Sequence, residues 1–172
     1  MVEGASRLIV LDTNALITLL TARKDCGEYN NLVAFLKQNK MLTYALPLPA
    51  LAEFLAGDDN EARSLELLNP SSKFMNLEFD KKSTLISAKI YRDYRNLPKN
   101  RKAQTPHQKI KVDIQIVGIA LANNAKFIIT HDAGIKRVIN ALNLSISVFD
   151  YVENEFIQDL SKLVLAESNR VQ

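Results

Sequence analysis

The chain has 172 residues, of which 47% are hydrophobic and 24% charged; this composition is that of a globular protein and excludes a long disordered chain or a repeat array. Its single cysteine, Cys26, excludes an internal disulfide and a multi-cysteine metal site. The opening MVEGASRLIV lacks the form of a signal peptide, and no stretch offers the roughly 20 apolar residues of a membrane span. We therefore expect one soluble, cytoplasmic domain over residues 1–172, with no membrane partner.

The net charge of +3 comes from one stretch, RNLPKNRKAQTPHQKIK (residues 95–111). It holds six of the 22 basic residues and no acid, so the rest of the chain has 16 basic against 19 acidic residues, a net charge of −3. Such a local surplus is typical of a surface that contacts a phosphate backbone, although a solvated basic loop has the same composition. The candidate phosphate contacts are Lys99, Arg101, Lys102, Lys109 and Lys111, with His107 as a further donor.

The first half of the chain alternates between strand-like and helix-like segments. LIVL at residues 8–11 is apolar at every position, which favours a central strand covered on both faces. In chain order we predict a strand at 8–11, helices at 15–21 and 29–38, a strand at 42–46 that ends at Pro47, a helix at 50–56, and a helix capped by Asp58 or Asp59 that runs to Leu68.

The second half continues the alternation. We predict a strand at 74–79, a helix capped by Asp80, the basic stretch, a helix that begins with a capping box at residues 105–108 and ends near Asn123, a strand at 125–130, a helix at 134–142, a strand at 145–149 and a closing helix at 153–166. Strands separated by helices predict a three-layer α/β/α fold with a central parallel sheet. Its core should span about residues 7–151, with the closing helix packed on it.

Two aspartates, Asp12 and Asp132, each come just after an apolar strand. Open parallel sheets bind ligands at the carboxyl ends of their strands, so both side chains should lie at that edge. Each is also in the position of an ordinary helix cap. Asp113 falls among isoleucines on the apolar stripe of a predicted helix, where a buried charge is unfavourable without a partner. A salt bridge to a lysine would explain Asp113 as well as a ligand role does.

Glu53 lies in ALAEFLAG, just after the second predicted strand, and taken alone could be a surface glutamate. Four carboxylates at one edge of a sheet repel one another unless a cation neutralises them. Oxygen ligands select Mg²⁺ or Mn²⁺ over zinc. Two such ions about 4 Å apart can activate water and stabilise the leaving oxygen in phosphodiester hydrolysis. An acidic pocket beside a basic stretch therefore favours a nuclease.

The ordered set of motifs resembles the PIN-domain nucleases, and in particular the VapC-like ribonucleases. Asp12 stands in LDTNALI, Glu53 follows the second strand, Asp113 begins DIQIVGIALANNA, and Asp132 ends IITHD. The resemblance implies that these four acids bind Mg²⁺ or Mn²⁺ and catalyse the cleavage of RNA. It also implies that Asn14 and Thr130 support the site by hydrogen bonds.

VapC-type toxins bind an antitoxin and often form homodimers, so the resemblance implies both kinds of partner. The basic stretch is longer than in compact PIN toxins, and the predicted closing helix is an addition. These departures bear on the toxin assignment more than on nuclease activity.

Three other readings remain open. A catalytically inactive PIN-like module would bind RNA or protein without cleaving. An aspartyl-phosphate phosphatase or receiver domain also has an acid after its first strand, but Asn14 stands where the phosphatase motif has its second acid. The five glycines form neither GxGxxG nor a P-loop, which disfavours a nucleotide cofactor. His131 could contact substrate or be an ordinary loop histidine.

Overall fold

The computed structural model describes residues 7–101 and 107–157. Lys102, most of the predicted capping box and the part of the predicted closing helix beyond residue 157 lie outside the described residues, as do the side chains of Arg101 and His107. No helix in the described ranges has the length and apolar character needed to cross a lipid bilayer.

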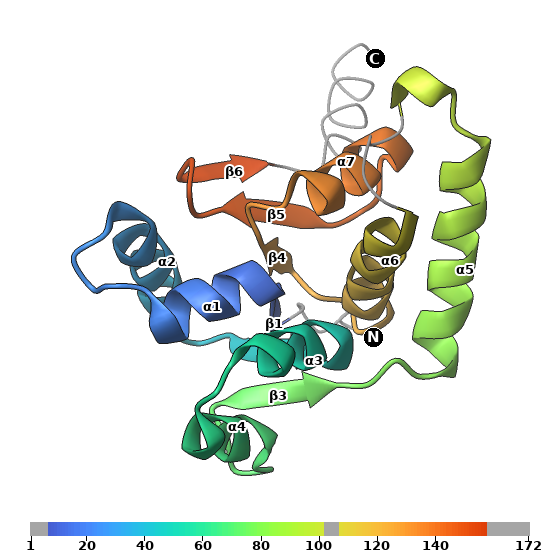
Figure 1. Ribbon diagram of the computed structural model, residues 1–172. Coiled ribbons are helices and arrows are strands. Elements are labelled where there is room, and N and C mark those ends of the chain that lie inside the picture. The colour runs from blue at the N-terminus through green and yellow to red at the C-terminus, as the bar shows by residue number, and fades with distance from the viewer. Residues whose placement is uncertain (1–6, 102–106, 158–172) are drawn as a thin grey trace, which may run out of the picture.

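Strands and helices alternate along the chain, as the sequence predicts (Figure 1). The strands are β1 (Leu8–Leu11), β2 (Thr43–Pro47), β3 (Phe74–Leu77), β4 (Phe127–Ile129), β5 (Ser147–Asp150) and β6 (Glu155–Ile157). The helices are α1 (Thr13–Thr21), α2 (Gly27–Gln38), α3 (Leu48–Gly57), α4 (Glu61–Leu68), α5 (Lys81–Asn96), α6 (His107–Ala122) and α7 (Ala133–Leu142), with a short 3₁₀ helix, η1 (Lys99–Arg101), after α5.

The six strands form one sheet in the order β3-β2-β1-β4-β5-β6, in which the first five are parallel. The chain runs outward from β1 to β3 and then returns to add β4 on the other side of β1. The strand order therefore reverses between β1 and β4, and ligands of open α/β sheets bind at such a point. The residues that follow these two strands are the ones that form the candidate site.

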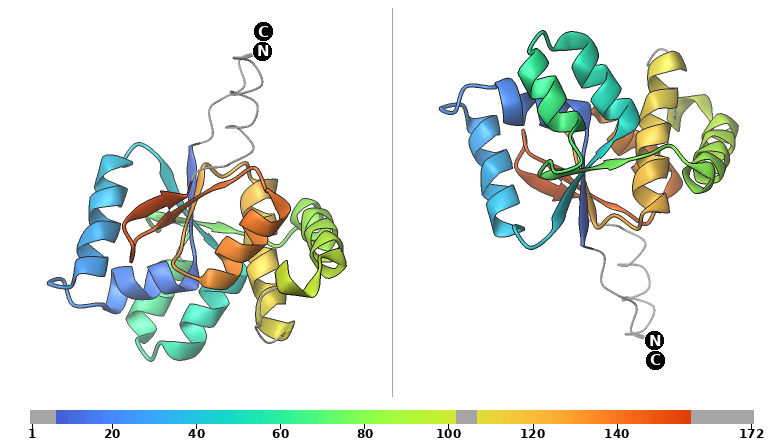
Figure 2. Two further views of the ribbon diagram at one scale, coloured as in Figure 1. Left: turned by 90° about the horizontal axis from the view of Figure 1, so that it is seen from above. Right: turned by 90° about the horizontal axis from the view of Figure 1, so that it is seen from below.

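Alternate residues of the strands pack on opposite faces of the sheet. Ile9 and Leu11 enter a core formed with α1, α2 and α4, whereas Val10 enters the core formed with α5, α6 and α7. Figure 2 shows these two helical layers on either side of the sheet. Because both faces are covered, every position of β1 beyond Leu8 is buried, which explains its uninterrupted apolar sequence. The three-layer fold is confirmed.

The predicted helix at residues 153–166 is wrong in its described part. Val152 and Glu153 donate backbone N–H groups to Asp150 Oδ1, and Asn154 adopts a left-handed conformation (φ 55°), so the chain turns back on itself. It continues as β6, antiparallel to β5. Phe156 packs edge-on against Phe127, with ring centroids 5.1 Å apart. Over so few residues, helical spacing of apolar side chains does not distinguish a helix from a strand.

One further prediction, at an element boundary, needs correction. The cap of α4 is Asn60, which accepts a hydrogen bond from the backbone of Arg63, and not Asp58 or Asp59. Asp58 instead forms an ion pair with the Arg63 side chain. The basic stretch is divided among elements: Arg95 lies in α5, and Lys109 and Lys111 lie in α6, the helix predicted after the capping box.

Candidate active site

A cleft of about 390 Å³ opens where β1 and β4 end. The side chains around it come from α1, α3, α6 and the start of α7, and include all four predicted acids. They are Asp12, Asn14, Glu53, Lys109, Val112, Asp113 and Asp132. The tertiary structure therefore brings together carboxylates that are far apart in the sequence.

Asp12 is both the cap of α1 and a wall of this cleft. Its Oδ1 accepts a hydrogen bond from the Thr13 backbone (2.6 Å), and its Oδ2 accepts one from Thr130 Oγ1 (2.7 Å). Only 4% of the residue is exposed, and burial raises the pKa of Asp12 to about 6. Thr130 also accepts a hydrogen bond from the Asp132 backbone (2.9 Å), so one buried hydroxyl joins the two strand-terminal aspartates.

Asp132 is likewise a cap, here of α7. Its Oδ1 accepts hydrogen bonds from the backbones of Gly134 (2.6 Å) and Ile135 (3.4 Å), and Lys109 Nζ lies 2.8 Å from its Oδ2. Burial acts to raise the pKa of Asp132, but the hydrogen bonds from Lys109 and Gly134 outweigh it, so this pKa lies below its usual value.

Asp113 projects from α6 into the cleft, between the buried residues Ile110 and Ile116. It is 4% exposed, and among the described residues nothing donates a hydrogen bond to its Oδ2. Burial, reinforced by the charge of Asp132, raises the pKa of Asp113 to about 7. The lysine that could have paired with it, Lys109, is bonded to Asp132 instead. Asp113 thus presents a buried carboxylate oxygen that lacks a cationic partner, a costly arrangement.

Glu53 reaches the cleft from α3 and is more exposed than the three aspartates. Thr13 Oγ1 lies 2.7 Å from Glu53 Oε2 and donates to it, with the carbonyl of Ala50 3.3 Å away. Thr13 therefore orients Glu53, as Thr130 orients Asp12. Nothing in the sequence indicated this role for Thr13, which lies between Asp12 and Asn14 in LDTNALI.

This geometry agrees with a family comparison. The family model described as PIN domain matches residues 9–140. The chain belongs to the PIN domain family. That family consists in general of nucleases, and the matched range contains all four acids that line the cleft. No curated protein sequence matches the chain.

Solved structures show the same fold. A chain from VapBC2 of Rickettsia felis, bound to a DNA fragment from the VapBC2 promoter, is 21% identical with a TM-score of 0.56, over 83% of this chain and 99% of that chain. A chain from VapBC of Salmonella typhimurium, bound to DNA, is 16% identical with a TM-score of 0.56, over 83% and 97%. A chain from a toxin-antitoxin complex of Klebsiella pneumoniae is 18% identical with a TM-score of 0.50, over 75% and 93%. At these identities the likeness concerns the fold.

Gly134 is a part of this PIN domain site that sequence analysis missed. A Cβ atom at this position would lie 2.3 Å from Asp113 Oδ2 and 2.9 Å from Asp132 Oδ1, closer than real Cβ contacts. The absence of a side chain therefore lets α7 begin against two carboxylates. The sequence signal was the glycine two residues after Asp132, in HDAG, at the start of a predicted helix.

His131 bonds to Tyr151, the residue that follows β5. Its Nδ1 lies 2.7 Å from the Tyr151 hydroxyl, which also lies 3.2 Å from Thr18 Oγ1, and the two rings meet edge to face. Burial raises the pKa of Tyr151 to about 12, so its hydroxyl keeps its proton. His131 is itself exposed. The residue is thus held beside the cleft of the PIN domain without lining it.

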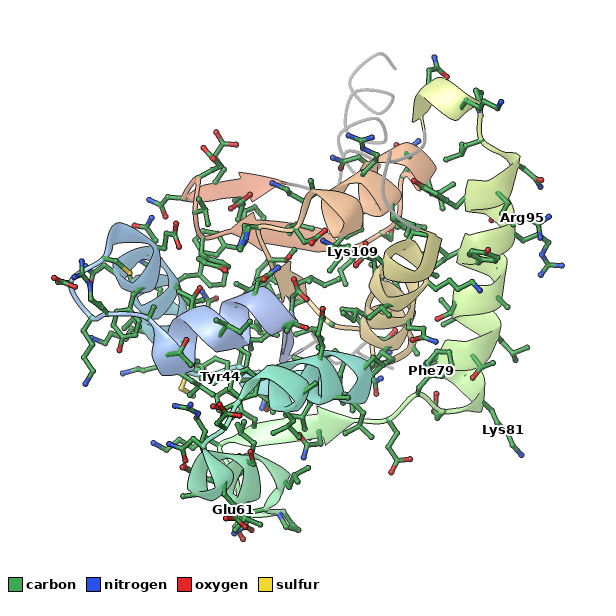
Figure 3. The ribbon with its side chains drawn as sticks, in the orientation of Figure 1. Tyr44, Glu61, Phe79, Lys81, Arg95 and Lys109 are labelled. Atoms are coloured by element: carbon green, nitrogen blue, oxygen red, sulfur yellow. The ribbon has the colours of Figure 1, made fainter. Side chains whose placement is uncertain are left out.

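The predicted phosphate contacts are dispersed. Among the described basic side chains, Lys109 alone lines the cleft, while Lys99 and Lys111 are exposed on η1 and α6. Figure 3 shows Lys109 directed from the start of α6 toward the middle of the molecule, in contrast to Lys81 and Arg95, which extend outward from α5. The side chain of Arg101 and the whole of Lys102 lie outside the described residues.

The donors in the cleft have the chemistry of a hard divalent-cation site. All four are carboxylates, and one buried oxygen, Asp113 Oδ2, lacks a hydrogen-bond donor among the described residues. In their present positions, no three His, Cys, Asp or Glu side chains of the described ranges are close enough to share one ion. The residue types therefore fit Mg²⁺ or Mn²⁺, and binding would require the carboxylates to draw closer together.

Proposed function

We propose that this PIN domain is a Mg²⁺- or Mn²⁺-dependent endoribonuclease. The observation that carries the proposal is the convergence of Asp12, Glu53, Asp113 and Asp132 on one cleft, where a buried oxygen of Asp113 has no hydrogen-bond partner among the described residues. Such an arrangement is unfavourable in an isolated protein and becomes favourable when a cation binds. The reaction is the hydrolysis of a phosphodiester bond in RNA.

Each residue of the cleft has a defined part in this mechanism. The four carboxylates would hold one or two divalent ions, which supply an activated water and stabilise the charge on the leaving oxygen. Thr130 orients Asp12 through its 2.7 Å hydrogen bond, and Thr13 orients Glu53 in the same way. These hydroxyls limit the rotation of the carboxylates and keep their remaining lone pairs directed at the cleft.

Phosphate binding is assigned to five basic residues of the stretch from Lys99 to Lys111, namely Lys99, Arg101, Lys102, Lys109 and Lys111. The preference for RNA over DNA comes from the family resemblance and not from a side chain that recognises a 2′-hydroxyl. Asn14 lines the cleft beside Asp12 and supplies an amide that can hydrogen-bond to a ligand or to a bound water.

We further propose that the protein is a VapC-type toxin that binds an antitoxin and forms a homodimer. The support is the likeness in fold to chains of three solved toxin-antitoxin or VapBC complexes. Apolar side chains are also exposed near the β3 edge of the sheet: Leu65 is 65% exposed, Leu68 51% and Met75 49%. Light scattering of the purified protein tests the dimer, and inhibition of cleavage by a stoichiometric partner protein tests the antitoxin.

The decisive experiment is cleavage of a labelled, structured RNA pool in Mn²⁺, Mg²⁺ or EDTA. Asp12→Asn and Asp113→Asn should each lower the cleavage rate by about 100-fold or more, because each removes a charged ligand worth several kcal/mol in the transition state. Asp93→Asn, at an exposed position of α5, is the matched control and should cleave normally. Metal-independent RNA binding without cleavage by any form would instead support the inactive binding module.

A further inference from the structure

Lys109 lies within the acidic cleft. Its Nζ is 2.8 Å from Asp132 Oδ2, and half of its side chain (50%) is exposed to solvent. Lys109 and Asp113 are four residues apart in α6, so their side chains project from the same face of that helix. The ammonium group therefore lies among the carboxylates and at the same time borders solvent.

The charge of Lys109 acts on more than its direct partner. Asp132 raises the pKa of Lys109 chiefly through their hydrogen bond, and the charges of Asp113 and Asp12 raise it further. The ammonium is the one cationic group among the described residues that line the cleft, where it faces four carboxylates. A divalent ion bound by Asp132 needs the oxygen that Lys109 now holds, and two cations cannot share that position without strong repulsion.

We propose that Lys109 is an internal counter-ion of the metal-free site, which a divalent ion displaces from Asp132 when it binds. Its half-exposed side chain can then move to the mouth of the cleft, where its ammonium meets a substrate phosphate. This inference rests on the proposed function, because it takes the acids to be metal ligands. In the described structure Lys109 already neutralises the charge of one of these acids.

A second lysine–aspartate pair, at the end of the neighbouring strand β5, has different surroundings. Lys136 pairs with Asp150, but the Lys136 side chain is only 24% exposed and the Asp150 side chain 2%. Neither residue lines the acidic cleft. The Lys136 pair is thus the less exposed of the two, whereas Lys109 has solvent on one side and three further carboxylates on the other. Only at Asp132 can a divalent cation replace the lysine while the displaced ammonium group stays in contact with solvent.

The test combines Mn²⁺ affinity with the chemical reactivity of Lys109. Mn²⁺ binding is measured by calorimetry on the wild type, Lys109→Met and Lys111→Met; Lys111 supplies the same charge from an exposed position of α6 outside the cleft. We expect Lys109→Met to bind Mn²⁺ about three- to tenfold more tightly, the equivalent of a partly exposed ion pair that no longer competes. Lys111→Met should change the affinity by less than twofold.

Amine acetylation followed by peptide mass spectrometry reports on the wild-type protein without a mutation. Lys109 should be acetylated slowly in EDTA and several times faster in Mn²⁺, while Lys111 reacts equally in both. Mn²⁺ binding with equal affinity by wild type and Lys109→Met, or continued protection of Lys109 in Mn²⁺, overturns this inference and leaves the nuclease proposal intact. Failure of both proteins to bind Mn²⁺ overturns the two together.

Discussion

Asp132 follows β4 and Asp150 ends the neighbouring strand β5. The two carboxylates make the same kinds of contact. In each, Oδ1 accepts hydrogen bonds from the backbone N–H groups two and three residues later, and Oδ2 pairs with a lysine. In each, burial acts to raise the pKa but the hydrogen bonds lower it. Taken singly, the two sites are alike.

Their surroundings differ. The Asp150 side chain is buried and its lysine is only partly exposed, and two residues after Asp150 stands Val152, which has an ordinary side chain. At Asp132 the equivalent residue is Gly134, whose missing Cβ leaves room for Asp113 to approach. The Asp150 pair therefore lies outside the acidic cleft, whereas the Asp132 pair lies in that cleft together with Asp12, Glu53 and Asp113. We infer that an aspartate at the end of a strand does not by itself indicate a metal site. The other acids beside Asp132 are what distinguish it from Asp150, which only stabilises a turn.

The largest effect should follow from closing the space at Gly134. Gly134→Ala places a methyl group against Asp113 and Asp132 and must displace them, and misplacement of a reacting group by about 1 Å can lower a rate about 100-fold. RNA cleavage in Mn²⁺ should fall by about that factor while the protein stays folded by circular dichroism. The matched control is Val152→Ala, beside Asp150, which should cleave RNA normally. Full activity in Gly134→Ala would falsify the assigned role of this glycine.

The next prediction compares how much Lys136 and Lys109 contribute to the free energy of unfolding. Lys136→Met leaves the buried Asp150 carboxylate without its cation, so the free energy of unfolding should fall by about 3 kcal/mol. The same substitution at the half-exposed Lys109 should change it by less than about 1 kcal/mol in EDTA. Urea unfolding monitored by circular dichroism measures both. Equal losses in the two variants would mean that the pairs are equivalent after all.

The pH dependence of stability should reveal the acids around Asp132. The pKa values of Asp12 and Asp113 are raised to about 6 and about 7, so between pH 5 and 8 the folded state binds more protons than the unfolded state. Stability in EDTA should therefore fall as pH rises through this window, by about 4 kcal/mol. Asp113→Asn should remove about two thirds of that fall, because its pKa is raised the more of the two. Asp132 and Asp150, with lowered pKa values, titrate below the window.

If the free energy of unfolding in EDTA stays constant or rises from pH 5 to 8, the raised pKa values of Asp12 and Asp113 are contradicted. Addition of Mn²⁺ at pH 8 should restore the lost stability in the wild type and not in Asp113→Asn, because ligand binding to the folded state stabilises it.

The smallest effect concerns the contact between the two regions. Tyr151 follows Asp150, and its hydroxyl bonds to His131, which precedes Asp132. Tyr151→Phe keeps the buried ring and removes the hydrogen bonds of its hydroxyl with His131 and Thr18, so the free energy of unfolding should fall by about 1 kcal/mol. Tyr29→Phe in α2 serves as the control for loss of a tyrosine hydroxyl. No change in urea unfolding would show that His131 is held by packing alone.

The sequence allowed much of the fold to be predicted because its signals are local. An all-apolar run such as residues 8–11 is specific for a doubly covered strand, and Asp80 does cap α5 as its position indicated. The predicted closing helix failed over its described residues, 153–157, because Phe156 and Ile157 fit either period, and the choice depends on pairing with β5. The cap of α4 failed because Asp58 pairs with Arg63, a side-chain contact that the capping rules do not include.

The sequence by itself determined the alternation of strands and helices, the four acids and their order, because apolar periodicity and residue type are properties of short segments. Only the tertiary structure decided which groups meet. The reversal of strand order between β1 and β4 puts Asp12 and Asp132 on either side of Thr130. The packing of α6 buries Asp113, whose Oδ2 has no donor in the part of the chain that the structure describes. The partner of Lys109, the orienting role of Thr13 and the space at Gly134 were likewise decided there. Each depends on distances between atoms that are remote in the chain, which local patterns do not encode.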